Sequence, residues 1–433
     1  MLQEMSINLW KFLLSLSDAI DLASPLISSH QIRTAYISWQ MARAAGLPEE
    51  RVERVFVAAL LHDIGALAPE DKVRLHRFET TDTETHCIFG ERLFSMTPLL
   101  RPAARIVRHH HTRWSDWNAS LDDPDVLEAQ LIYLGDLIER YVDRDRYILH
   151  QPDDIISKIT EVAGTEIHPD VVDMFVSLSK REDVWLDLAS PRLYSLLLNF
   201  GPFRRIEIDV SDIYTLSQLF RSIIDFRSAY TATHSTGVAS CAAVLSRLFG
   251  LTDTEVTLME VAGNLHDLGK LAIPNSILNK PGKLTDDEFA VMKQHTYYTY
   301  SILNSIGGME YIFITEWAAF HHEKLDGSGY PFHISGEKIS TGARIMTVAD
   351  IFTALAEDRP YRKGMPRKEV EEILTWQAGH GKLDSALVGL LKSNYGDILA
   401  ETRDMQARSL QNYEKHWAKQ ENTPGIIGES ASQ

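Results

Sequence analysis

Apolar residues recur at helical spacing through most of the chain. Two clear runs are Val52, Val55, Phe56, Ala59 and Leu60, and later Val256, Leu258, Met259, Val261, Ala262 and Leu265. Residues three and four positions apart lie on one face of an α-helix, so each run predicts a helix with a buried face. Short loops are marked by Gly46-Leu47-Pro48, Pro281-Gly282 and residues 327–331. Because no convincing series of alternating strands accompanies these runs, the pattern predicts an all-α fold.

The sequence also contains an internal duplication. His30 and His62 are 32 residues apart, as are His234 and His266, and each second histidine is followed by Asp-x-Gly. Further pairs follow in the same order: His86 and His295, His109-His110-His111 and His321-His322, and Asp136 and Asp350. A repeat of this length predicts two related helical domains in tandem. We place them at residues 1–205 and 206–403, and we expect the polar residues 404–433 to form a loose tail.

Composition narrows the functional classes. A length of 433 residues suits two domains, and 44% hydrophobic and 24% charged residues are ordinary for a globular protein. A formal net charge of -17 argues against binding of nucleic acid polymers, which requires clustered Lys and Arg. Cys87 and Cys241 give no disulfide framework and are expected to be small buried residues. Without a basic leader or a run of about 18 apolar residues, we expect a cytoplasmic protein with no membrane span.

The C-terminal copy gathers side chains that suit transition metals. Seven residues are candidate ligands: His234, His266, Asp267, His295, His321, His322 and Asp350. Mixed imidazole and carboxylate donors favour iron, manganese, zinc or nickel over calcium or magnesium. Seven donors exceed the three or four that one ion needs, so we expect two ions that share Asp267. A pair of metals suits hydrolysis of a phosphate ester, because it activates water and stabilises both the attacking and the departing oxygen.

Several motifs within about 190 residues of the C-terminal copy together form a specific pattern. They are Tyr230 to His234, His266 to Pro274, Lys280 to Leu284, the H-H-E-x-x-D-G-x-G-Y-P segment His321 to Pro331, and Val348 to Arg362. This series resembles the HD-GYP family, a branch of the HD phosphohydrolases whose members hydrolyse cyclic dinucleotides. The resemblance implies an HD-type helical fold, the seven metal ligands given above, and iron or manganese as the metals. It also implies that Lys270 contacts a substrate phosphate, and that Arg359, Arg362 and Tyr330 contribute to substrate binding.

The resemblance implies a phosphodiesterase for a bacterial second messenger. Cyclic di-GMP is the first expectation for the substrate, and the mixed 3',3'-cyclic GMP-AMP is the alternative. A sensor that binds the dinucleotide without cleaving it, and a broader nucleotide phosphohydrolase, remain open. A homodimer and a signalling partner at the GYP loop are compatible with the resemblance.

Two positions depart from the family pattern. Tyr230 stands where some members have the Glu of a third metal site, which favours two metals. Thr353 stands where many members have an Asp three residues after the last ligand, which puts one supporting contact in doubt.

The N-terminal copy keeps a similar set of metal-donor residues but lacks the lysine and the GYP loop of the C-terminal copy. The candidate ligands of a second metal site are His30, His62, Asp63, His86, His110 and Asp136, with His109 and His111 as alternative registers. Ala66 replaces Lys270, and residues 112–117 stand in place of the GYP loop. Three interpretations remain: a regulatory or dimerising domain, a metal-bound but non-catalytic sensor, and a second phosphohydrolase.

Overall fold

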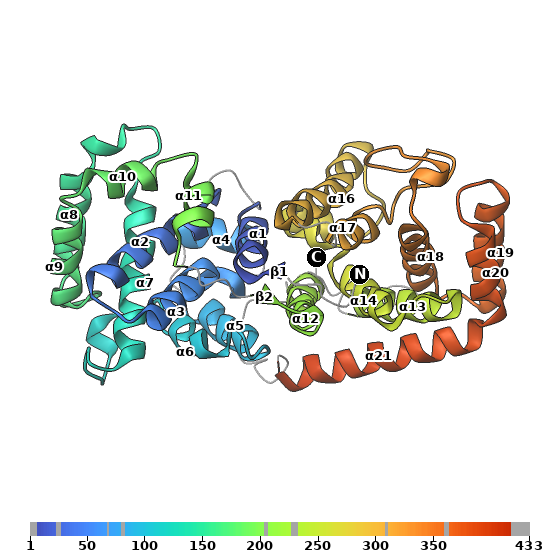
Figure 1. Cartoon of the computed structure of the whole chain (residues 1–433), viewed down its shortest axis with the longest axis horizontal. Helices are drawn as coiled ribbons and strands as arrows, with labels where there is room; N and C mark the ends of the chain where they lie inside the picture. The colour runs from blue at the N-terminus through green and yellow to red at the C-terminus, as the bar shows by residue number, and fades with distance from the viewer. Residues whose placement is uncertain are drawn as a thin grey trace, which may run out of the picture.

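The computed structural model describes residues 7–22, 27–66, 69–78, 83–202, 207–226, 233–307, 311–358 and 363–416. Helices dominate these residues, and they form two lobes that lie side by side (Figure 1). The prediction of an all-α fold with two tandem helical domains is therefore confirmed. The one sheet among the described residues has two strands of two residues each.

The N-terminal lobe contains β1 and the first group of helices (Figure 1). Their bounds are β1 Ile7–Asn8, α1 Leu9–Asp21, α2 His30–Ala44, α3 Glu49–Leu60, η3 His62–Gly65, α4 Pro69–His76, α5 Glu84–Ser95, η4 Arg101–Ala103, α6 Ala104–Arg108, η5 Trp114–Asp116, α7 Pro124–Tyr141, η6 Ile148–His150, α8 Pro152–Glu161, α9 Pro169–Leu178, α10 Glu182–Leu188 and α11 Leu193–Phe200. The apolar run in residues 52–60 forms the buried face of α3, as predicted.

The C-terminal lobe repeats the arrangement. Its elements are β2 Glu207–Ile208, α12 Val210–Phe226, α13 His234–Phe249, α14 Asp253–Leu265, η7 Leu268–Ala272, α15 Asn275–Leu278, α16 Asp286–Ile306, α17 Tyr311–Ala319, η8 Gly336–Lys338, α18 Thr341–Ala356, α19 Arg367–Gly379, α20 Ser385–Ser393 and α21 Tyr395–His416. Two helices begin with a capping box: α14, which precedes His266 and Asp267, and α16, which contains His295. The capping pairs are Thr252 with Glu255 for α14 and Thr285 with Glu288 for α16.

The two lobes join through the first elements of each copy. β1 pairs with β2 antiparallel, with Ile7 opposite Ile208, and helix α1 packs against α16 and η7 of the C-terminal lobe. Phe12 of α1 makes an edge-to-face contact with Tyr311, with ring centroids 6.3 Å apart. Ser305 Oγ donates a hydrogen bond to Ser15 Oγ at 2.8 Å. Helix α1 is therefore shared between the lobes and contacts the segment η7 that follows Asp267.

The predicted loose tail is wrong for its first part. Helix α21 continues to His416, and its Gln406 Nε2 donates hydrogen bonds to the Thr233 carbonyl and to Glu357 Oε2, both at 3.2 Å. The helix packs along α13, so residues 404–416 belong to the C-terminal lobe. A polar composition did not prevent this, because a helix on the surface needs only one apolar or hydrogen-bonded face. Residues 417–433, and the predicted domain boundary near 205, lie outside the described residues.

Both cysteines are free and buried, as expected from the sequence. Among the described residues, every helix is too short or too polar to cross a membrane.

Candidate metal centre

The seven residues predicted as ligands converge in the C-terminal lobe. His234 is the first residue of α13, His266 and Asp267 follow α14, His295 lies in α16, His321 and His322 follow α17, and Asp350 lies in α18. All are buried except His322, whose side chain is 28% exposed. Three helices and the segments that follow two others thus bring together residues up to 116 positions apart in the sequence, and His234 Nε2 lies 3.2 Å from Asp350 Oδ1.

Three of the histidines are held in the same way by the backbone. Nδ1 of His266, His295 and His321 lies 2.6–2.8 Å from the carbonyl oxygen three residues earlier. A carbonyl oxygen can only accept, so Nδ1 carries the proton in each ring. Nε2 therefore presents a lone pair to the cluster, which is how metal-binding histidines are usually oriented.

His234 is held by a carboxylate instead. Its Nδ1 lies 3.0 Å from Glu357 Oε1. Glu357 was not predicted from the sequence, although it lies seven residues after Asp350 and so on the same helical face. In the N-terminal copy the same contact comes from Glu139, at 2.6 Å from His30 Nδ1. Glu139 aligns with Thr353, so the contact that Thr353 put in doubt is supplied in the C-terminal copy by Glu357.

Asp267 lies between two groups of histidines. Its Oδ2 is 3.1 Å from His266 Nε2, and its Oδ1 is 3.5 Å from His295 Nε2. Two groups have ligand atoms within 4.8 Å of one another: His234, His266 and Asp267, and His295, His321 and His322. A carboxylate that faces both groups is suited to bridging two ions, and the presence of two ions stays a prediction.

The electrostatics of the cluster fit metal binding. Burial lowers the pKa of His295 to about 4 and that of His322 to about 3, despite the opposing Asp267 and Asp350. Burial opposes ionisation of Asp267, but His266 and Lys270 hold its pKa well below the usual range. Neutral imidazole and ionised carboxylate are the forms that bind metals. His234 differs, because Glu357 and Asp350 outweigh its burial and raise its pKa to about 10.

Gly269 lets η7 pack directly on the helix that carries His295. A Cβ atom at this position would lie 2.0 Å from the His295 carbonyl oxygen and 2.8 Å from Thr299 N. Its amide donates to Thr299 Oγ1 at 2.9 Å, and Thr299 Oγ1 donates to the His266 carbonyl at 3.0 Å. These contacts fix the position of His295 relative to His266 and Asp267.

Lys270 and the GYP loop border the cluster. Lys270 Nζ lies 2.6 Å from Asp267 Oδ2, and its side chain is 17% exposed, so it contacts both the cluster and solvent. In the loop, a Cβ on Gly329 would lie 2.5 Å from the His322 carbonyl oxygen, and Tyr330 N donates to that oxygen at 3.2 Å. The rings of Tyr330 and His322 are 4.8 Å apart. The loop therefore packs tightly beside one predicted ligand.

Three residues singled out in the sequence have no described position. Arg359 and Arg362, predicted to bind substrate, and Tyr230 lie outside the described residues. Their roles stay predictions.

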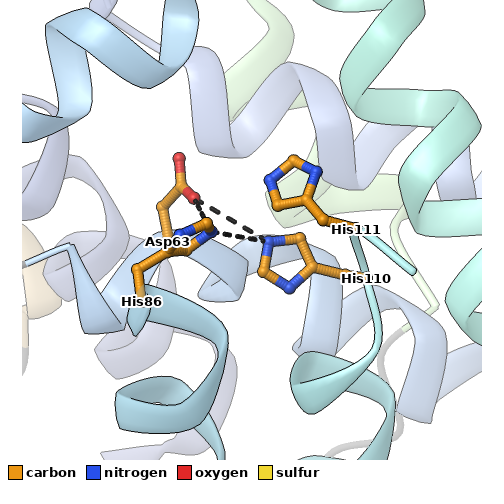
Figure 2. A group of neighbouring side chains, drawn as sticks. All are labelled: Asp63, His86, His110 and His111. Atoms are coloured by element: carbon orange, nitrogen blue, oxygen red, sulfur yellow. Dashed lines mark hydrogen bonds and ion pairs between the residues drawn. The ribbon is translucent and has the colours of Figure 1, made fainter. Parts of the chain in front are cut away.

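The N-terminal copy brings its predicted ligands together in the same order. Figure 2 shows Asp63, His86, His110 and His111 side by side. His110 Nδ1 lies 2.6 Å from the Val107 carbonyl, which matches His321, so His111 matches His322. His109 instead lies 3.1 Å from Thr112 Oγ1 and packs on Trp117. The register that the sequence left open is therefore His110-His111, and His109 is outside the cluster.

Comparison with known proteins agrees with this architecture. A family profile described as HD domain matches residues 218–387, and a second HD domain profile matches residues 27–141. The 3'3'-cGAMP-specific phosphodiesterase 1 of Vibrio cholerae is 30% identical over 401 residues, which cover 90% of this chain and 93% of that protein. The cyclic di-GMP phosphodiesterase response regulator RpfG of Xanthomonas campestris is 42% identical over 160 residues, which cover 36% of this chain and 41% of that protein.

A solved structure shows the same fold. The crystal structure of a cyclic GMP-AMP specific phosphodiesterase of V. cholerae, V-cGAP3, matches with a TM-score of 0.64 at 22% identity, over 90% of this chain and 98% of that chain. Two HD domains with clustered histidines and aspartates define a metal-dependent phosphohydrolase of the HD class. Within that class, the chain belongs to the HD-GYP-type cyclic dinucleotide phosphodiesterases with tandem HD domains.

Proposed function

We propose that this chain hydrolyses 3'3'-cyclic GMP-AMP at the C-terminal centre. The proposal rests on how much of this chain each similar protein covers. Two relatives named 3'3'-cGAMP-specific phosphodiesterases match over 90% and 82% of this chain, whereas the cyclic di-GMP phosphodiesterase RpfG matches over 36%. The similarity that includes both lobes is thus to proteins named for cyclic GMP-AMP. This reverses the order of substrates expected from the sequence, which put cyclic di-GMP first.

The C-terminal centre would hold two divalent transition-metal ions, with iron or manganese favoured. The inward Nε2 atoms, the ionised carboxylates and the two groups of donors around Asp267 support this number. The seven ligands would be His234, His266, Asp267, His295, His321, His322 and Asp350. Bound there, the ions supply positive charge to the phosphate oxygens and activate the attacking water.

The chain's own residues would orient the substrate and the ligands. Asp267 would bridge both halves of the centre, since each of its oxygens faces a different group. Lys270 would contact the phosphate and offset the charge that develops in the transition state, because its ammonium lies at the border of the cluster and is partly exposed. Tyr330, which packs beside His322, would line the substrate site. Arg359 and Arg362 remain candidates for contacts to phosphate or guanine.

The substrate assignment can be tested with the purified full-length chain, reconstituted with iron(II) or Mn²⁺. Initial rates are measured on 3'3'-cyclic GMP-AMP, cyclic di-GMP and a nucleoside triphosphate. We expect kcat/KM for 3'3'-cyclic GMP-AMP to exceed that for cyclic di-GMP by about tenfold or more, a difference of about 1.4 kcal/mol in transition-state binding.

Three results would overturn the proposal. Equal or faster cleavage of cyclic di-GMP would restore the first substrate expected from the sequence. Binding of cyclic dinucleotides without hydrolysis by the metal-loaded protein would identify a sensor. Cleavage of the triphosphate alone would indicate a broader nucleotide phosphohydrolase.

Lys270→Ala is expected to lower kcat by about a hundredfold and to leave the bound metal in place. The loss of an ammonium that stabilises transition-state charge has this size, and Lys270 is not among the predicted ligands. Steady-state kinetics and metal content measured on one preparation check the prediction. Lys368→Ala, at an exposed position of α19, is the control and should keep wild-type rates. Loss of metal in Lys270→Ala would contradict the assigned role.

Cytoplasmic placement, a homodimer and a signalling partner at the GYP loop stay predictions.

A further inference from the structure

The N-terminal cluster repeats the geometry of the C-terminal centre. Asp63 Oδ2 lies 3.6 Å from His30 Nε2 and 3.5 Å from His62 Nε2, and Asp63 Oδ1 lies 3.4 Å from His86 Nε2. Asp63 thus faces one group of histidines with each oxygen, as Asp267 does. His30, His62, Asp63, His86, His110 and Asp136 are all at least nine-tenths buried.

Several nitrogen lone pairs point inward in this cluster. Nδ1 of His62 lies 2.8 Å from the Ala59 carbonyl and Nδ1 of His110 lies 2.6 Å from the Val107 carbonyl, so Nε2 is the acceptor in both rings. These Nε2 atoms lie 3.3 Å from His30 Nε2 and 3.2 Å from His86 Nε2, respectively. Each of these lone pairs therefore faces a second ring nitrogen across a gap that either a proton or a metal ion can occupy.

The carboxylate of Asp63 adds a second observation. Within the described part of the chain its buried Oδ1 accepts no hydrogen bond, although His86 Nε2 lies 3.4 Å away. A proton shared by two rings would leave that oxygen unsatisfied, at a cost of about 1–3 kcal/mol. An ion with ligands at about 2.1 Å separates adjacent ligand atoms by roughly 3.0–3.4 Å. The separations of 3.2–3.6 Å in this cluster are close to those values.

We propose that the N-terminal domain holds its own pair of divalent transition-metal ions, in a centre that does not hydrolyse the substrate. Its ligands would be His30, His62, Asp63, His86, His110, His111 and Asp136. His111 belongs to the group with Asp63, His86 and His110 whose donor atoms lie within 4.8 Å of one another. The centre is separate from the proposed catalytic one.

The surroundings of the cluster explain why it would not be catalytic. Ala66, which is buried, occupies the position of Lys270, so the ammonium beside Asp267 has no counterpart there. Arg140 takes a different place: its Nη1 lies 3.0 Å from Asp136 Oδ2, and its Nε donates to the His76 carbonyl at 3.4 Å. With only 8% of its side chain exposed, Arg140 is fixed against a ligand rather than directed to solvent. The ligands are therefore complete, and the phosphate-binding lysine is absent.

The test measures metal content of the full-length chain after loading with Mn²⁺ and removal of free metal, by inductively coupled plasma mass spectrometry. Asp267→Ala removes the carboxylate shared by the C-terminal ligands. We expect this variant to keep about half of the wild-type metal, and Asp267→Ala combined with His110→Ala to lose at least half of the remainder. A metal-free Asp267→Ala protein with intact helical circular dichroism would overturn the proposal.

Neighbouring histidines give a matched control. His110→Ala should lower the metal content of the otherwise wild-type chain, whereas His109→Ala should leave it unchanged, because His109 contacts Thr112 and Trp117 instead. Equal metal content in the two variants would contradict the N-terminal centre. Both variants should retain hydrolysis of the cyclic dinucleotide. Metal content does not depend on which substrate is cleaved, so failure of the substrate proposal would be seen separately.

Thermal unfolding gives a readout that does not require counting ions. Mn²⁺ should raise the unfolding temperature of Asp267→Ala, since a ligand that binds the folded state stabilises it. The same addition should have a smaller effect on Asp267→Ala combined with His110→Ala. An identical response of the two proteins would overturn the proposal.

Discussion

Asp267→Ala is expected to lower hydrolysis on the order of a thousandfold or more, and to remove metal from the C-terminal centre. Asp267 is 2% exposed and its two oxygens face His266 and His295, so its loss would affect both halves of the centre at once. The helical fold should survive, because η7 and α16 keep their backbone contacts. Kinetics and metal analysis on the same preparation check the result.

A carboxylate at the start of α14, the helix that precedes Asp267, provides the control. Asp253 lies in the first turn of α14, and Asp253→Ala should change turnover little. Unchanged hydrolysis in Asp267→Ala would refute a metal centre built around that carboxylate.

Gly269→Ala is expected to disable the same centre without removing any ligand. The new Cβ would lie 2.0 Å from the His295 carbonyl oxygen, and backbone atoms of α16 cannot rotate away as a side chain would. Relief requires η7 and α16 to separate, which would displace His295 from Asp267. Because misplacement by about 1 Å can cost a hundredfold in rate, we expect a loss of about that size. The free energy of unfolding should fall by about 1–3 kcal/mol, as for other overpacked sites.

Gly389→Ala is the matched control for this substitution. Gly389 lies within α20, and a Cβ there would meet no heavy atom within 4 Å. Alanine favours the helix over glycine by about 1 kcal/mol, so this variant should be as stable as wild type or more stable, with unchanged activity. Denaturant unfolding and steady-state kinetics would compare the two. A Gly269→Ala protein with wild-type activity would show that the close packing is not required.

The duplicated motif explains how much could be predicted without a structure. Gly65 and Gly269 both follow a His-Asp pair, and a Cβ on either would lie 2.0 Å from the carbonyl oxygen of the next ligand, His86 or His295. The same close packing therefore occurs in both copies. The His-Asp pair and the glycine lie close enough in sequence to be recognised as a motif. Helical periodicity and this repeat were sufficient to predict the fold class, and they singled out the donor residues that the structure brings together in each lobe.

The contacts that support the ligands were not visible in the sequence. Glu357 replaces the carboxylate expected at Thr353 because Thr353, in the last turn of α18, and Glu357, directly after the helix, lie four positions apart, and only packing decides which of them contacts His234. The choice of His110 over His109 likewise depends on which ring faces the cluster at the end of α6. The continuation of α21 to His416 was missed because its largely polar sequence gives no sign of its packing along α13 or of its hydrogen bond to Glu357.

By itself, the sequence determined that the chain is all-α, that it repeats, and which residue types gather for metal chemistry. These properties follow from the local periodicity of apolar residues and from the order of the metal-donor residues, and both can be read from one amino-acid sequence. Only the tertiary structure decided which atoms meet. It oriented Nε2 inward through backbone carbonyls, turned the oxygens of Asp63 and Asp267 to opposite groups, and shared α1 between the lobes. Such contacts depend on distances between residues far apart in the chain, which no local pattern encodes.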